Sequence, residues 1–137
     1  MAKHVVAVAG DVAPGSRKLV NVKGRQIVIF NQGGEYFALL NKCPHEGAQL
    51  CFGRLVSLLE SDEPGTYRHS RHGEMLKCPW HGWEFDIRTG QSYCAPDSTF
   101  VRTYSVTVEP GESLAKGPFM AETFPVSVEG SYLVVEL

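Results

Sequence analysis

The chain has 137 residues, of which 43% are hydrophobic and 20% are charged, so it is long enough for one domain with a buried core. Its formal net charge of -2 lacks the positive excess with which proteins bind nucleic acids or anionic membranes. Lys3 and other charged or small residues interrupt the apolar residues near the N-terminus, and no stretch approaches the roughly 20 apolar residues of a membrane span. We therefore expect no nucleic-acid partner and no membrane partner.

Short segments with alternating or β-branched apolar residues recur along the chain and predict β-strands. In chain order, the expected strands are 4–9, 18–22, 25–31, 35–41, 75–77, 83–87, 91–93, 101–109, 123–128 and 131–136. The dipeptides at 23–24 and 129–130 predict hairpin turns, and 88–90 predicts a tight turn. Residues 51–60 are the best helix candidate, although no segment keeps a helical period for more than about two turns. The pattern predicts an all-β fold, with an antiparallel β-sandwich or barrel.

Two short boxes hold the residues with recognisable chemistry. One is CPHEGA at 43–48, and the other is CPWHGW at 78–83. Each box holds one thiol and one imidazole: Cys43, His45, Cys78 and His81. Such a donor set suits zinc, or an iron–sulfur cluster with two cysteines on one iron and two histidines on the other. The prolines and glycines of the boxes predict tight loops rather than a helical zinc finger, which favours iron.

The boxes resemble those of Rieske-type [2Fe–2S] proteins, especially the soluble ferredoxins and the oxygenase domains, whose second box commonly continues His-Gly-Trp as 81–83 does here. The resemblance spans about 36–93. It implies a single Rieske domain over 1–137, in which strands from both termini carry a smaller cluster-binding subdomain at about 43–94. It also implies one [2Fe–2S] cluster per chain. One iron would be held by two cysteines and the other by two histidines: Cys43 and Cys78, and His45 and His81.

The boxes lack the features that raise the potential of high-potential relatives. Those relatives carry one more cysteine in each box, joined as a disulfide, where this chain has Ala48 and Trp80. They also carry a serine and a tyrosine whose hydroxyls donate to cluster sulfurs, where this chain has Trp83 and Phe85. Fewer donors stabilise a reduced cluster less. We therefore expect a potential near or below the bottom of the range of about -150 to +300 mV for such centres.

The boxes are separated by 32 residues between His45 and Cys78, roughly twice as many as in soluble relatives. The extra segment falls within 54–74, and we expect an exposed elaboration because loops tolerate insertions at little entropic cost. A contact with a partner or with another copy of the chain is the alternative. His69 and His72 in this segment lack a companion cysteine and a neighbouring glycine loop, so we do not expect them to be ligands.

Two cysteines lie outside the boxes, Cys51 and Cys94. We expect buried free thiols rather than a disulfide between them. Reduced thiols and a low-potential electron carrier both suit the reducing cytoplasm, so we expect a cytoplasmic protein.

The resemblance implies a stand-alone, low-potential ferredoxin that takes single electrons from a flavin-dependent reductase and passes them to a terminal oxygenase or a similar acceptor. A Rieske oxygenase needs a further domain with a mononuclear iron, whereas the 43 residues after Cys94 contain no histidine. We therefore expect an electron-transfer component of an oxidoreductase system rather than an enzyme by itself. Two alternatives stay open, a non-catalytic Rieske-like subunit of a larger oxygenase or nitrite reductase and a structural zinc module. The sequence leaves the oligomeric state open.

Overall fold

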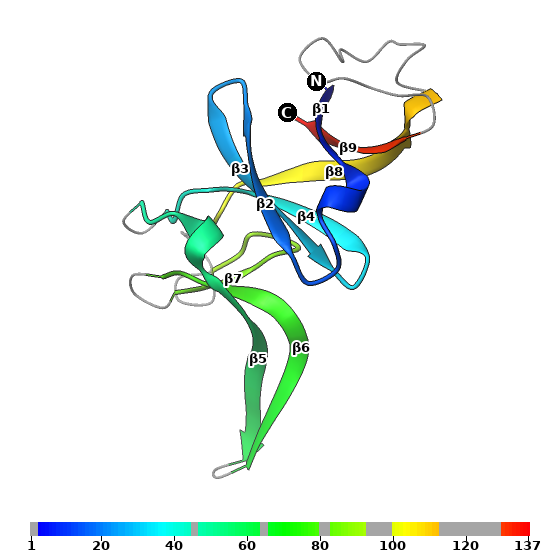
Figure 1. Ribbon diagram of the computed structural model, residues 1–137. Coiled ribbons are helices and arrows are strands. Elements are labelled where there is room, and N and C mark those ends of the chain that lie inside the picture. The colour runs from blue at the N-terminus through cyan, green and yellow to red at the C-terminus, as the bar shows by residue number, and fades with distance from the viewer. Residues whose placement is uncertain (1–2, 45–46, 64–65, 80–82, 93–99, 113–129) are drawn as a thin grey trace. The chain divides into compact units, whose positions relative to one another are not determined.

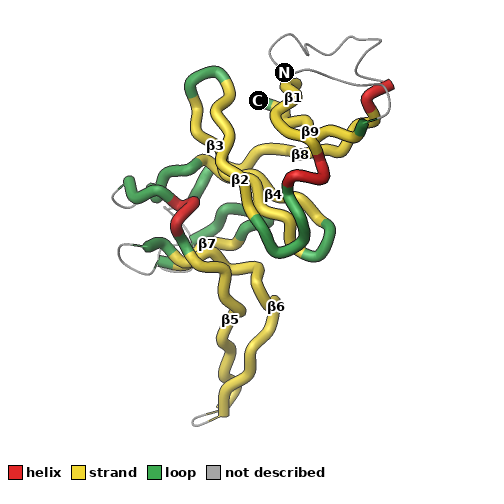
Figure 2. The backbone as a smooth tube through the Cα atoms, viewed as in Figure 1, coloured by secondary structure: helices red, strands yellow, loops and turns green. Residues whose placement is uncertain are grey.

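The computed structural model describes residues 3–44, 47–63, 66–79, 83–92, 100–112 and 130–137, with the backbone alone described over 57–73. The chain divides into two compact units. One combines Met1–Leu40 with Tyr104–Leu137, and the other is Asn41–Thr103. Within the described ranges the regular structure is almost entirely β-strand (Figures 1 and 2), so the predicted all-β, antiparallel fold class is confirmed.

The first unit is built around a six-stranded sheet with the order β1-β9-β8-β4-β3-β2. Its strands are β1 Lys3–Val8, β2 Arg17–Val22, β3 Arg25–Gln32, β4 Glu35–Leu40, β8 Thr103–Pro110 and β9 Ser131–Glu136. The two ends of the described chain lie side by side, because β1 pairs antiparallel with β9 and Lys3 stands opposite Glu136 (Figure 1). The edge strands β1 and β2 also contact each other, so the sheet is nearly closed into a barrel.

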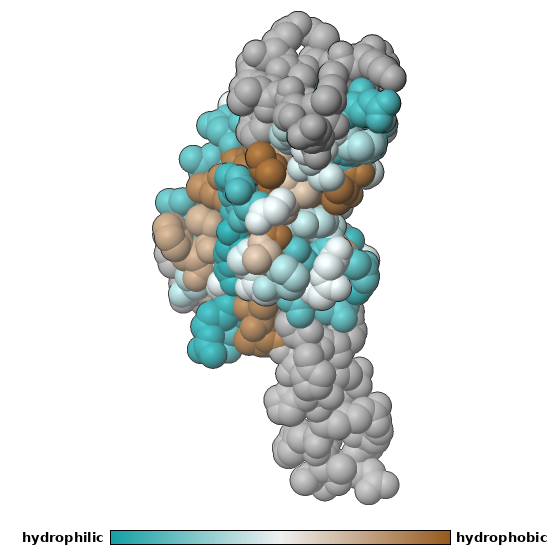
Figure 3. Space-filling view, turned by 45° about the vertical axis from the view of Figure 1, so that its right-hand side comes forward, coloured by the Kyte–Doolittle hydropathy of each residue, from teal (hydrophilic) through white to brown (hydrophobic). Residues whose placement is uncertain are grey.

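Apolar and polar residues alternate along the strands, so the apolar side chains lie on the buried face of this sheet. In β2, Val20 and Val22 are buried while Leu19 and Asn21 are exposed. The core cluster combines side chains of all parts of the sheet: Ala7, Val12, Val20, Val22, Ile27, Ile29, Ala38, Tyr104, Leu133 and Val135. Burial of an aliphatic side chain of this kind contributes about 1.5–3 kcal/mol. On the face drawn in Figure 3, hydrophilic side chains predominate among the described residues and apolar ones form small separate patches.

The predicted hairpin turn at 23–24 is present between β2 and β3. Val22 pairs with Arg25, so the turn has two residues. Lys23 and Gly24 both have positive φ, at 52° and 80°, which is the backbone of a type I′ turn. A glycine at the second position accepts this conformation without strain.

Asn31 joins two loops of the first unit. Its buried Nδ2 donates to the carbonyl oxygen of Val12 at 2.8 Å, and its Oδ1 accepts from the N–H of Gly34 at 2.9 Å. Asn31→Leu leaves the Val12 carbonyl and the Gly34 N–H without these partners, so we expect the free energy of unfolding to fall by about 2–3 kcal/mol. Urea denaturation measures the change. The exposed Asn21 provides the control: Asn21→Leu is expected to shift stability by less than about 0.5 kcal/mol, and equal effects would contradict the role of Asn31.

The second unit contains a three-stranded sheet with the order β5-β6-β7. Its strands are β5 Arg54–Glu63, β6 Thr66–Lys77 and β7 Glu84–Asp86. The expected helix over 51–60 is wrong, because only a 3-10 turn, Leu50–Phe52, precedes β5. The apolar run was ambiguous by itself. Pairing with β6, which places Leu55 opposite Leu76, makes it a strand. The segment 54–74 thus forms β5 and most of β6 as a long hairpin (Figure 1).

The other expected strands have different outcomes. The first four match β1 to β4, and the last matches β9 at 131–136. The expected 101–109 begins later, as β8 from Thr103, and 83–87 shortens to Glu84–Asp86. In 91–93, Gln91 and Ser92 form only isolated bridges. The expected strand 123–128 lies outside the described residues.

Candidate metal centre

The first box is a closed turn that fixes Cys43. The N–H of Cys43 donates to the carbonyl oxygen of Ala48, and the N–H of Gly47 donates to that of Cys43, both at 2.8 Å. Gly47 has a φ of +83°, a conformation that side-chain-bearing residues rarely adopt. Cys43 is only 1% exposed. The local sequence therefore holds one thiol in a buried position, and the predicted tight loop is present over its described residues.

Asn41 supports the same loop from the end of β4. Its Oδ1 accepts a hydrogen bond of 2.6 Å from the N–H of Cys51, and the residue is 5% exposed. This bond ties the start of the box to the 3-10 turn Leu50–Phe52. Sequence reasoning missed the role of Asn41. The available signal was a polar residue that directly follows the apolar strand and stands two positions before the first cysteine.

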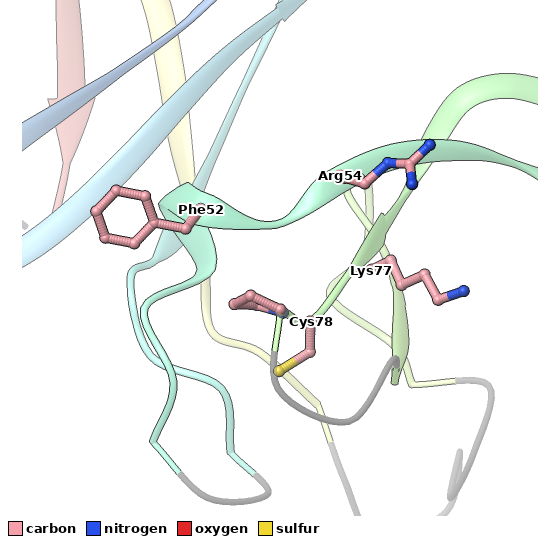
Figure 4. Close-up of a pocket in the computed structure, with 5 residues that line it drawn as sticks. Phe52, Arg54, Lys77 and Cys78 are labelled. Carbon is pink, nitrogen blue, oxygen red and sulfur yellow. The ribbon is translucent and has the colours of Figure 1, made fainter.

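The second box begins where β6 ends. The N–H of Cys78 donates to the carbonyl oxygen of Trp83 at 2.7 Å, and Lys77 pairs with Glu84 across β6 and β7. The box is therefore the connection of a hairpin. Cys78 is 4% exposed, and its side chain points away from that of Lys77 in Figure 4, as successive residues of a strand do.

A turn after β7 supports the second box. The N–H of Gly90 donates to the carbonyl oxygen of Asp86 at 2.7 Å, and the carbonyl oxygen of Gly90 accepts from the N–H of Val101 at 2.8 Å. Beside the turn, Arg88 Nε lies 2.6 Å from Glu74 Oε1 in an ion pair. The tight turn predicted at 88–90 is thus present and attached to β6. It joins the strand that leads into the second box to the segment that follows the box.

The structure describes two of the four predicted ligands, the cysteines. Cys43 and Cys78 both lie in the second unit, are buried and form no disulfide. His45 and His81 lie outside the described residues, so the full ligand assignment stays a prediction. No group of three or more histidine, cysteine or acidic side chains that could hold a metal occurs within the described ranges.

The cysteines outside the boxes are only partly described. Cys51 is half-buried rather than fully buried as expected, and it forms no disulfide. Cys94 lies outside the described residues. The backbones of His69 and His72 lie in β6, and their side chains are outside the description.

The two buried thiols, Cys43 and Cys78, fit an iron–sulfur group. Cysteine is among the soft ligands that bind iron–sulfur clusters, and the structure has two buried thiols on separate hydrogen-bonded loops, which is the number of cysteines that a Rieske donor set requires. Each loop keeps its cysteine backbone N–H engaged within the box itself. These hydrogen bonds therefore fix the backbone of both cysteines.

Known proteins resemble the chain over most of its length. The family model for the Rieske [2Fe-2S] domain matches residues 2–105. The ferredoxin component of the naphthalene 1,2-dioxygenase system of Pseudomonas putida is 31% identical over 108 residues, which cover 78% of this chain and 88% of that protein. The 3-phenylpropionate/cinnamic acid dioxygenase ferredoxin subunit of Escherichia coli (strain K12) is 33% identical over 86 residues, which cover 63% of this chain and 67% of that protein.

Solved structures agree on the fold. The ferredoxin of carbazole 1,9a-dioxygenase from Nocardioides aromaticivorans IC177 has a TM-score of 0.60 over 97% of both chains, at 22% identity. The Sphingomonas yanoikuyae B1 ferredoxin has a TM-score of 0.57 at 28% identity, covering 77% of this chain and 88% of that one.

These matches place the chain in the Rieske [2Fe–2S] domain family. The resemblance drawn from the two boxes is confirmed, and the cofactor is a Rieske-type [2Fe–2S] cluster rather than a structural zinc ion. The relatives are ferredoxins, so the expected class of function, electron transfer, is also confirmed. None of the helices in the described part of the chain has the length and apolar character needed to cross a membrane.

Proposed function

We propose that this chain is a stand-alone, low-potential ferredoxin of the cytoplasm, which carries single electrons from a flavin-dependent reductase to a terminal oxygenase or a similar acceptor. The observation that carries the proposal is the share of a ferredoxin relative's length that aligns with this chain. The alignment spans 88% of a protein that is named as the ferredoxin component of the naphthalene 1,2-dioxygenase system. On this proposal the chain is an electron-transfer component rather than an enzyme by itself.

The proposed organisation is one Rieske domain over 1–137 with its cluster-binding subdomain at about 43–94. The compact unit Asn41–Thr103 supports this division, because it contains Cys43 and Cys78 together with the turn and the β6–β7 hairpin in which they lie. The first unit, with strands from both ends of the chain, is the proposed base.

The proposed ligands are Cys43 and Cys78 on one iron and His45 and His81 on the other. When bound, the cluster accepts and releases one electron. The chain contributes shielding from water, since both cysteines are at most 4% exposed. The position that carries a hydroxyl in high-potential relatives is the fully buried Phe85 here. Without that donor the reduced state is less stabilised, which supports a low potential.

Electron paramagnetic resonance of the dithionite-reduced protein, with iron and sulfide analysis, tests the proposed ligation. We expect two irons per chain and an average g value below that of all-cysteine clusters. A silent spectrum with stoichiometric zinc, or with no metal, would refute the proposal.

Replacement of a histidine ligand by cysteine is expected to lower the reduction potential. In His81→Cys an anionic thiolate replaces a neutral imidazole, and adding an electron to a more negative site is harder. We expect a fall of about 100 mV or more, toward the roughly -400 mV of all-cysteine plant-type ferredoxins, in a potentiometric titration. His69→Cys, outside the boxes, is the control and is expected to leave the potential unchanged. An unchanged potential in His81→Cys would remove His81 from the ligand set.

One observation favours a second candidate function, a non-catalytic subunit of a larger oxidoreductase of the oxygenase or nitrite reductase type. The β5–β6 hairpin extends over Arg54–Lys77 and offers an edge strand on which a fixed partner could pair. Co-purification with a large subunit at constant stoichiometry would favour this function over the stand-alone carrier.

A further inference from the structure

A pocket lies beside the second box. Its volume is about 420 Å³, and its lining residues are Phe52, Arg54, Lys77, Cys78 and Pro79 (Figure 4). Three of them offer chemistry to a partner: an aromatic ring and two cations. Phe52 is 71% exposed, the highest value among the large hydrophobic side chains that the structure describes. A side chain so exposed adds little to the core, and its ring is accessible to a partner.

The two cations stand next to each other. Arg54 on β5 pairs in register with Lys77 on β6, and both residues are exposed. Figure 4 shows their charged ends directed to the same side of the strand pair. Like charges opposite each other on neighbouring strands are destabilising, so this arrangement is unfavourable for the isolated fold.

Neither charge is neutralised by the described residues. Glu84 pairs in register with Lys77 on its other side, yet the described part of the chain contains no ion pair for Lys77 or for Arg54. The chain as a whole carries a net charge of -2. The pocket beside Cys78 is therefore a local positive site on a weakly acidic protein.

We propose that Arg54 and Lys77, with Phe52 on the opposite side of Cys78 (Figure 4), form a docking face for a protein redox partner that presents carboxylates to one side of an apolar patch. The proposal rests on the proposed function, whose partner it characterises by its charge. Exposed aromatic and arginine side chains are the residues that most often anchor interfaces, and paired cations steer and orient an acidic surface. Because Cys78 lines the same pocket, a partner held by this docking face is brought next to a proposed cluster ligand.

Oxidation by two small oxidants of opposite charge tests the charge of the docking face. Ferricyanide, a trianion, takes one electron from the reduced holoprotein and becomes ferrocyanide; tris(phenanthroline)cobalt(III), a trication, takes one electron and becomes the cobalt(II) complex. At low ionic strength, Arg54→Gln/Lys77→Gln is expected to slow the ferricyanide reaction about tenfold. The cobalt reaction is expected to be unchanged or faster. At about 1 M salt the difference is expected to vanish, because charges are then screened within about 3 Å.

The design separates docking from a change in potential. A shifted cluster potential changes both rates in the same direction, whereas docking charge changes them in opposite directions or changes only one. Lys23→Gln/Arg25→Gln, which removes two cations from the β2–β3 turn, is the matched control and is expected to leave the ratio of the two rates unchanged. Equal effects of the two double variants would overturn the proposal, as would parallel changes with both oxidants.

A binding measurement tests the partner itself without electron transfer. The probe is an immobilised peptide of ten glutamates with one central leucine, presented to the holoprotein at low ionic strength. We expect Phe52→Ser and Arg54→Gln/Lys77→Gln each to weaken binding at least tenfold, and Glu84→Gln to strengthen it. Binding that is insensitive to both changes would overturn the docking face. Stoichiometric binding of inorganic phosphate that blocks the peptide would also overturn it, and would make the pocket a small-anion site. A missing cluster signal would instead count against the proposed function.

Discussion

Cys78→Ser is expected to abolish cluster binding, with iron falling from two atoms per chain to nearly none. A serine hydroxyl is a poor substitute for the soft thiolate that iron–sulfur clusters require. The site cannot readily recruit another ligand from solvent, because Cys78 is 4% exposed and its backbone is held by the bond to Trp83. Iron and sulfide analysis of the purified protein, with the visible spectrum, measures the loss.

Cys51→Ser is the matched control for this experiment. Cys51 is half-buried, forms no disulfide and lies eight residues after the first ligand. Its contact with Asn41 runs through the backbone N–H, which serine retains. We expect full iron content in this variant. Loss of iron in Cys51→Ser, or its retention in Cys78→Ser, would show that the ligands are assigned wrongly.

Gly90→Ala is expected to lower the free energy of unfolding by about 3 kcal/mol or more. A Cβ at position 90 would lie 2.0 Å from the carbonyl oxygen of Val101, and the backbone there has a φ of +78°. The chain must therefore move at the point where Val101 donates its N–H to Gly90. Denaturant unfolding of the holoprotein gives the magnitude, and the iron content of the folded fraction shows whether the second box is disturbed.

Gly24→Ala separates the steric clash with Val101 from the backbone strain of a positive φ. Gly24 has nearly the same φ, +80°, but nothing lies within 4 Å of a Cβ built there. Only the backbone strain remains, so we expect a loss of about 1–2 kcal/mol. Equal losses in both variants would show that the close approach to Val101 does not contribute.

Local patterns were sufficient to predict most of the first unit. The strands near 18–22 and 131–136 follow from a two-residue alternation that can be counted within one segment, and the structure places them as β2 and β9. The error at 51–60 has the opposite origin. The residues of β5 are a strand because β6 pairs with them, with Arg54 opposite Lys77 and Leu55 opposite Leu76, and a short window around the start of β5 contains neither partner.

In the candidate site, too, local patterns were predicted from the sequence and long-range contacts were missed. The four proposed ligands were found from spacing, since a thiol and an imidazole within one loop form a local pattern. Asn41 was missed because its partner is the backbone of Cys51 rather than a box residue. Position 90 requires glycine because the backbone of Val101, eleven residues away, approaches it closely. This requirement was missed because the two positions are far apart in sequence. The partners in such contacts are set by tertiary approach, and a short stretch of sequence does not identify them.

The pairing of β1 with β9 determines when the sheet can be completed during synthesis. Lys3 pairs with Glu136, so β1 cannot form its hydrogen bonds with β9 until almost the whole length described here has been translated. Asn41–Thr103, by contrast, is a compact unit formed by one continuous stretch of the chain and leaves the ribosome earlier. Because contacts close in sequence form faster than distant ones, the segment with Cys43 and Cys78 can fold, and be available for iron, while the six-stranded sheet of the first unit is still incomplete.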